Sequence, residues 1–193
     1  MSSISNDTSE DLGDRILDAA ASCVLAYGVD RVTLAEIARR AGVSRPTIYR
    51  RWPDTRALLA ALLTARIVGV LRDLPPRGAG RQALVERIVG VAERLRHDEV
   101  VMSVFHSAPE LAMVYIAERL GTSQQILIEA VATELETAQR DGSVRDGDPR
   151  QLAAMCLLIT QSTIQSAQIV EPILDAGALA AELAHALNGY LRP

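Results

Sequence analysis

The stretch TLAEIARRAGVSRPTIYRRW, residues 33–52, constrains the fold more than any other part of the chain. Thr33, followed three residues later by Glu36, forms a capping-box pattern that begins a helix. Gly42 permits the sharp turn that ends this helix, and Ser44 is a preferred N-cap for the next one. The sequence therefore predicts two short helices joined by a tight turn. This arrangement is a helix-turn-helix, which places its second helix in the major groove of DNA.

Positive charge is concentrated around the same stretch. The chain has a net charge of -4, and all 20 of its basic residues are arginine. Residues 31–66 contain eight arginines and two acidic residues, a net charge of +6, whereas residues 1–30 carry -5. A basic segment on an acidic chain is typical of a polyanion-binding site. We therefore expect double-stranded DNA as a partner.

The remaining sequence predicts only helices. Apolar residues recur at helical spacing, and neither strand-like alternation nor an internal repeat is present. Breaks are expected at LPPRGAG (residues 74–80) and at DGSVRDGD (residues 141–148). We expect an all-α fold of about nine helices. The expected divisions are a disordered tail over residues 1–10, a helix-turn-helix domain over 11–53 and a larger helical domain over 54–193.

Composition and motifs argue against several other classes of protein. The longest uninterrupted apolar run, residues 152–159, is far shorter than a membrane span, and the polar N-terminus does not resemble a signal peptide. We therefore expect a cytoplasmic protein without a membrane partner. Cys23 and Cys156 lie among apolar neighbours, which favours buried free thiols over a disulfide.

The sequence contains no recognisable catalytic constellation. We find no nucleophile elbow and no phosphate-binding glycine loop. His97, His106 and His185 show no metal-ligand spacing with one another or with either cysteine. We therefore expect no enzymatic activity, no metal and no cofactor.

Residues 15–63 resemble the TetR family of transcriptional regulators. The similarity is carried by ILDAAASCVLAYGVDRVTLAEIARRAGVS, by TIYRRW and by PDTRALLAALL. The resemblance implies a three-helix DNA-binding domain, a larger helical domain with a small-molecule pocket, and a homodimer on a palindromic operator. It usually implies repression relieved by ligand. Family members often have a lysine near the start of the fourth helix, where this chain has Thr55 and Arg56, so the phosphate contact would fall to Arg56.

The second helix of the motif provides most of the candidate DNA contacts. We expect Arg45 to bind a guanine through two parallel hydrogen bonds, and Tyr49 and Arg50 to contact phosphates. Ile48 is expected in the core. The full candidate set is Thr33, Ser44, Arg45, Pro46, Thr47, Tyr49, Arg50 and Arg56. Arg39, Arg40 and Arg51 fit a solvated surface as well as a DNA contact, and Trp52 fits the core better than DNA.

The larger domain supplies candidates for a dimer interface and a ligand pocket. The helix from about residue 149 is apolar on every side and must be covered on all faces. We expect it to pair with the last helix across a two-fold axis through Leu152, Met155, Ile159, Leu179, Leu183 and Leu187. The candidate pocket for an apolar ligand comprises Met102, Phe105, His106, Met113, Tyr115, Met155 and Gln161. Ordinary core packing is the alternative for these pocket residues.

The hypothesis that unites these features is a homodimeric repressor that a small apolar ligand releases from its operator. One alternative is a transcriptional activator, because the sign of regulation depends on operator position. Another is a dimeric helical ligand-binding protein whose helix-turn-helix no longer binds DNA. The basic segment disfavours this last alternative.

Overall fold

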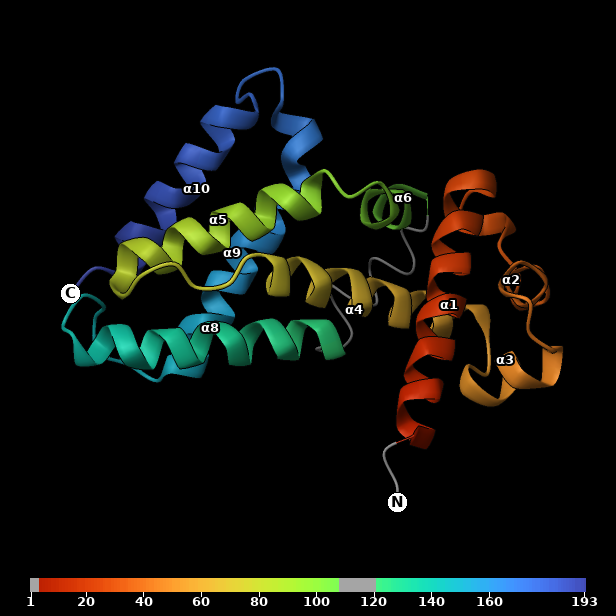
Figure 1. The fold of residues 1–193 in the computed structure, drawn as a ribbon. Helices are drawn as coiled ribbons and strands as arrows, with labels where there is room; N and C mark the ends of the chain where they lie inside the picture. The colour runs from red at the N-terminus through yellow and green to blue at the C-terminus, as the bar shows by residue number, and fades with distance from the viewer. Residues whose placement is uncertain (1–3, 108–120) are drawn as a thin grey trace. The chain divides into compact units, whose positions relative to one another are not determined.

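The computed structural model describes residues 4–107 and 121–193. Within these ranges it contains nine α-helices, one short 3-10 helix and no strand, which confirms the predicted all-α class. The helices form two compact units (Figure 1). Unit 1 comprises the chain up to Arg66 together with α6, and unit 2 comprises Ile67–Asp98 and the chain from residue 121 onward.

Unit 1 is built around the N-terminal helices. Its elements are α1 (Ile4–Tyr27), η1 (Val29–Arg31), α2 (Leu34–Ala41), α3 (Arg45–Arg51), the first half of α4 (Thr55–Asp73) and α6 (Glu99–Ser107). Ile16, Ile37, Ile48 and Leu58 are buried in its core. The α6 helix contacts α1 and η1. The compact units therefore divide the chain differently from the boundary expected at residue 54, and the assignment of separate functions to the two domains stays a prediction.

The N-terminal segment differs from the expected disordered tail. The α1 helix begins at Ile4, so residues 4–10 are helical. The segment lacks apolar periodicity, which is why its sequence suggested a tail.

Unit 2 is a helical bundle. It contains the second half of α4 together with α5 (Gly80–Arg96), α8 (Thr122–Arg140), α9 (Pro149–Val170) and α10 (Ala176–Leu191). The α5 helix contacts α8, α9 and α10, and α9 contacts α8 and α10. Leu84, Leu135, Cys156, Leu187 and Leu191 belong to the shared core. The helix that the sequence predicts from about Ser107 to Gly121 lies largely outside the described residues.

Two helices of unit 2 begin with side-chain caps. The Asp148 carboxylate accepts a hydrogen bond from the Gln151 N–H (2.9 Å), and Pro149 is the first residue of α9. The Asp175 carboxylate accepts one from the Ala178 N–H (2.8 Å) at the start of α10. Such caps satisfy amides that have no partner within the helix.

Among the described helices, α9 is the one long and apolar enough to cross a membrane by length and composition. It packs against α5, α8 and α10, and 22% of its apolar window is buried within the single chain. The helix also buries a polar side chain, Thr160, whose hydroxyl donates to the Cys156 carbonyl (2.8 Å). These contacts bury one face of α9 in the helical bundle of unit 2.

Both cysteines are free and buried, as the sequence predicted. Burial raises the pKa of the Cys156 thiol to about 11 and also raises that of Cys23. Because the thiolate is the reactive form, both side chains are poor nucleophiles near neutral pH.

Candidate nucleic-acid interface

Local hydrogen bonds shape the turn between α2 and α3. The Thr33 hydroxyl accepts a hydrogen bond from the Glu36 N–H (3.2 Å) and caps α2. Gly42 ends α2 in the left-handed conformation (φ 66°, ψ 34°), which favours glycine. The next residue, Val43, donates its N–H to the Ala38 carbonyl (3.0 Å) and closes the turn.

The predicted capping box at α2 is only half formed. The Glu36 carboxylate pairs with Arg39 through bonds of 2.6 and 3.0 Å. The half of the box that is formed is the bond from the Glu36 backbone N–H to the Thr33 hydroxyl, as predicted. The hydrogen bond from Arg39 is the main reason that the pKa of Glu36 lies below its usual value. Arg39 competes with the Thr33 backbone N–H for the Glu36 carboxylate. The capping-box pattern alone does not show which of the two donors binds it.

The α3 helix has one buried and one exposed face. The Ser44 hydroxyl caps it by accepting from the Thr47 N–H (3.3 Å), and the two hydroxyls lie 2.7 Å apart. Ile48 is 0% exposed and holds the helix against the core, whereas Tyr49 is 51% exposed. Arg50 is exposed beside Tyr49. One face of α3 therefore packs against the core of unit 1, and the other face is exposed to solvent.

The predicted DNA-binding residues all lie in unit 1, at the start of α2, along α3 and at the start of α4. All are exposed except Thr47, which is half-buried: Thr33, Ser44, Arg45, Pro46, Thr47, Tyr49, Arg50 and Arg56. Arg56 follows the α4 cap, in which the Asp54 carboxylate accepts from the Ala57 N–H (2.7 Å). Within the described part of the chain, Arg45, Arg50 and Arg56 form no ion pair.

Other arginines of the basic segment are engaged within unit 1. Arg39 pairs with Glu36. The Arg40 guanidinium lies 5.5 Å from the centre of the Tyr27 ring, a distance suited to a cation–π interaction. The Arg51 guanidinium lies against Gly13 of α1, so closely that a Cβ atom there would be 2.7 Å from Nη1. The structure thus separates arginines that hold the unit together from those that face solvent without a counter-charge.

The predicted dimer residues divide into two groups. Leu152, Leu183 and Leu187 are buried in the core of unit 2 within the single chain, and their place in a dimer interface stays a prediction. Ile159 and Leu179 are half-buried. Met155 is 41% exposed and shares the outer face of α9 with Leu158 (60%) and Ile169 (80%). We call these last three residues the outer stripe of α9.

Three of the predicted ligand residues have described side chains, and their role in binding a ligand stays a prediction. Met102 lies on α6 in unit 1, whereas Met155 and Gln161 lie on α9 in unit 2. Met155 points outward, and Gln161 accepts a hydrogen bond from the Gln124 side chain (2.9 Å). The side chains of Phe105, His106, Met113 and Tyr115 lie outside the described residues.

A groove in unit 2 lies between α5, α9 and α10, with Glu93, Arg96 and Thr163 among its lining residues. It offers about 20 Å³ of space for the centres of water molecules. That is room for about one or two waters and not for a drug-sized molecule. In the described ranges, no group of three or more His, Cys, Asp or Glu side chains is placed to hold a metal ion.

Comparisons with known proteins place this interface in a family. The model of bacterial regulatory proteins of the tetR family matches residues 16–62. HTH-type transcriptional regulators of Mycobacterium bovis and Mycobacterium tuberculosis are 68% identical over 191 residues, covering 99% of this chain and 100% of each relative. Among solved structures, the Rhodococcus erythropolis transcriptional repressor QsdR has a TM-score of 0.69 at 20% identity, covering 95% of this chain and 97% of its own.

A second structural neighbour is FadR from Bacillus subtilis in complex with stearoyl-CoA. Its TM-score is 0.64 at 19% identity, covering 92% of this chain and 98% of its own. At such identities these neighbours show the fold, while the mycobacterial relatives and the family model carry the assignment. The helix-turn-helix, its exposed basic face and these matches lead to one conclusion: the chain belongs to the TetR family of transcriptional regulators.

Proposed function

We propose that the protein is a homodimeric repressor that binds a palindromic operator and releases it when a small apolar ligand binds. The observation that carries the DNA-binding part is the exposed face of α3. Arg45, Tyr49 and Arg50 are exposed on α3, while Ile48 is buried. Helix-turn-helix proteins read bases with the N-terminal residues of this helix, which assigns sequence reading to Arg45 and backbone contacts to Tyr49 and Arg50.

The dimer is supported by the outer stripe of α9. Met155, Leu158 and Ile169 leave a band of apolar surface on a helix whose opposite face is already packed. Large apolar side chains exposed on one face of a helix are suited to an interaction site. A second copy of the chain that covers the stripe would present two recognition helices, which must lie about 34 Å apart to enter successive major grooves.

The ligand part of the proposal rests on a structural neighbour and on the helical bundle of unit 2. One structural neighbour, FadR of Bacillus subtilis, forms a complex with stearoyl-CoA, and the helices of unit 2 enclose an apolar core. A ligand relieves repression only if it binds the DNA-incompetent form more tightly than the competent one. We propose an apolar molecule as that ligand and the cytoplasm as the location of the protein.

Selection of bound sites from a pool of random duplexes tests this function directly. We expect an enriched palindrome whose half-sites lie one helical turn apart, or a multiple of it. A protein that binds no duplex even in low salt would instead favour the alternative of a ligand-binding protein without DNA function. Enrichment of an asymmetric site would contradict the symmetric dimer.

Replacing Arg45 with alanine is expected to weaken binding to the selected operator by roughly 1–3 kcal/mol and to relax preference at one base position. The reason is the loss of a bidentate contact to a guanine. Titration of the operator and of its single-base variants measures both effects. Arg39→Ala is the matched control, because Arg39 is paired with Glu36. Equal losses in the two variants would contradict the assignment of Arg45.

Replacing Arg50 with alanine is expected to weaken binding to all sequences alike. A phosphate contact releases condensed counterions, so its loss lowers the slope of log affinity against log salt by about one per site. Titrations at several salt concentrations, on operator and on unrelated duplex, measure this slope. An unchanged slope, or a loss confined to one base pair, would show that Arg50 does not act on the backbone.

A further inference from the structure

The α4 helix is continuous, yet it belongs to both compact units. Residues 55–66 lie in unit 1 and residues 67–73 lie in unit 2. Its first turn carries Arg56, directly after the recognition helix, and its last turn lies in the bundle. The last carbonyl groups of any helix lack partners within the helix. Whatever binds these carbonyls fixes the end of α4 in unit 2.

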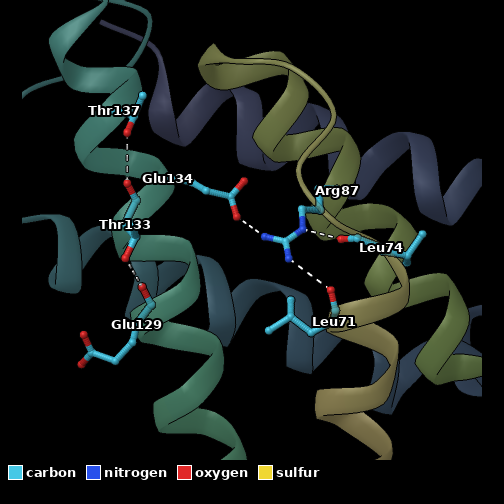
Figure 2. A network of polar contacts seen from close by, with 7 residues as sticks. All are labelled: Leu71, Leu74, Arg87, Glu129, Thr133, Glu134 and Thr137. Carbon is cyan, nitrogen blue, oxygen red and sulfur yellow. Dashed lines mark hydrogen bonds and ion pairs between the residues drawn. The ribbon is translucent and has the colours of Figure 1, made fainter.

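One side chain of α5 binds the end of α4. The Nε atom of Arg87 donates to the Leu74 carbonyl (2.6 Å), and its Nη2 atom donates to the Leu71 carbonyl (3.2 Å). Figure 2 shows the guanidinium between these two carbonyls and the α8 helix. A positive charge at a helix C-terminus is favoured by the helix dipole. The Leu74 side chain also packs against α5, because its Cδ1 atom lies at ordinary contact distance (3.8 Å) from the position that a Cβ of Gly90 would occupy.

The remaining nitrogen of the Arg87 guanidinium, Nη1, binds a side chain of α8. Nη1 of Arg87 forms an ion pair with the Glu134 carboxylate (Figure 2). The side chains are only 11% and 20% exposed, respectively. Burial raises the pKa of Glu134, although Arg87 opposes this shift. Removal of either partner therefore leaves a poorly solvated charge, which is much more costly than loss of a surface pair.

We propose that Arg87 is a positioning residue that locks the end of α4 to α5 and α8 and so transmits changes in the bundle to the DNA-binding unit. The inference rests on the proposed function, because it names the contact through which a ligand in unit 2 would act on DNA binding. Only an arginine carries donors in a planar fork that reaches two carbonyls and a carboxylate together. Lysine keeps the charge but has a single nitrogen.

Two variants and one matched control test this role. Arg87→Lys keeps the ion pair and loses the fork, and Glu134→Gln keeps an acceptor and loses the charge. Glu129→Gln makes the same chemical change on the same helix, but Glu129 pairs with Arg150 in an exposed ion pair (58% and 71% exposed). Thermal unfolding followed by circular dichroism checks that each variant folds.

The decisive readout is the distance between spin labels in the two units. Asp30→Cys and Asp146→Cys provide exposed labelling sites in unit 1 and unit 2. The native thiols are buried with raised pKa values and should remain unlabelled. Doubly labelled chains are mixed with excess unlabelled protein so that distances within one chain dominate. Wild type and Glu129→Gln should give the same distribution. Arg87→Lys should give a broader distance distribution than wild type. The width of the Glu134→Gln distribution should lie between those of wild type and Arg87→Lys.

Affinity for the selected duplex provides a second readout. Arg87→Lys should lower it roughly fivefold or more, the lower range of coupling between distant sites, although Arg87 is far in sequence from the recognition helix. A folded Arg87→Lys variant with the wild-type distance distribution overturns the inference, and so does equal broadening in Glu129→Gln. The distance measurement needs no DNA. It therefore decides on the role of Arg87 even if the wild-type protein binds no duplex, which would overturn the proposed function separately.

Discussion

Replacing Ile48 with alanine is expected to lower the free energy of unfolding by about 2–5 kcal/mol. Ile48 is the buried residue of α3, a helix of seven residues that is too short to be stable by itself. The substitution removes apolar contacts and leaves a cavity beneath the recognition helix, so operator affinity should fall as well. Urea denaturation followed by circular dichroism measures the change in stability.

Tyr49→Ala is the control for this prediction. Tyr49 neighbours Ile48 but is half exposed, so its removal should change stability by no more than about 0.5 kcal/mol. Its proposed phosphate contact means that DNA affinity should still fall. The two variants therefore separate the anchoring of α3 from its contact with DNA. Equal stability losses would show that α3 is not held by its buried face.

Replacing Leu158 with glutamate is expected to convert the dimer to a monomer at micromolar concentration. Leu158 lies in the outer stripe of α9 and is 60% exposed in the single chain. A carboxylate there would be desolvated without a partner when a second chain covers the stripe. Because each half-site would then be bound separately, affinity for the operator should fall roughly 100- to 10,000-fold. Sedimentation velocity and duplex titration measure the two effects.

Leu25→Glu is the matched control for the dimer. Leu25 is a similarly exposed leucine (51%) on α1 in unit 1, so the same substitution there should leave the dimer intact. If the Leu158 variant also remains a dimer, the chains associate through another surface. A wild-type protein that sediments as a monomer at micromolar concentration would refute the homodimer itself.

The interface assignments show where helical periodicity stops being informative. Spacing identified Leu183 and Leu187 as one apolar stripe of the last helix, and this stripe exists, but it faces the core of unit 2. On α9, which is apolar on all sides, the sequence does not distinguish the face that packs within the chain from the face left over. Only the positions of α5, α8 and α10 around α9 leave Leu158 and Ile169 exposed.

Helix boundaries were predictable where a local signal marks them. Thr33, Ser44 and Asp148 cap their helices through bonds to residues three positions along the chain, so the pattern is visible in the sequence. The α6 helix was not anticipated as a separate element. Neither glycine nor proline marks the break at residues 97–98, and only the packing of α6 against α1 and η1 shows that it belongs to unit 1.

The amino-acid sequence by itself determined the helix-turn-helix, its caps and its concentration of arginine, because these depend on residue type and on contacts within one or two helical turns. The tertiary structure alone decided which arginines of the basic segment are engaged within unit 1. Arg40 and Arg51 are engaged by Tyr27 and Gly13 of α1, whereas Arg45 and Arg50 are exposed.

The same holds for the pair of Arg87 and Glu134, which lie 47 positions apart in sequence. No spacing rule connects residues on separate helices. Their meeting is a consequence of how α4, α5 and α8 pack, since the free energy that brings them together comes from burying the apolar faces around them.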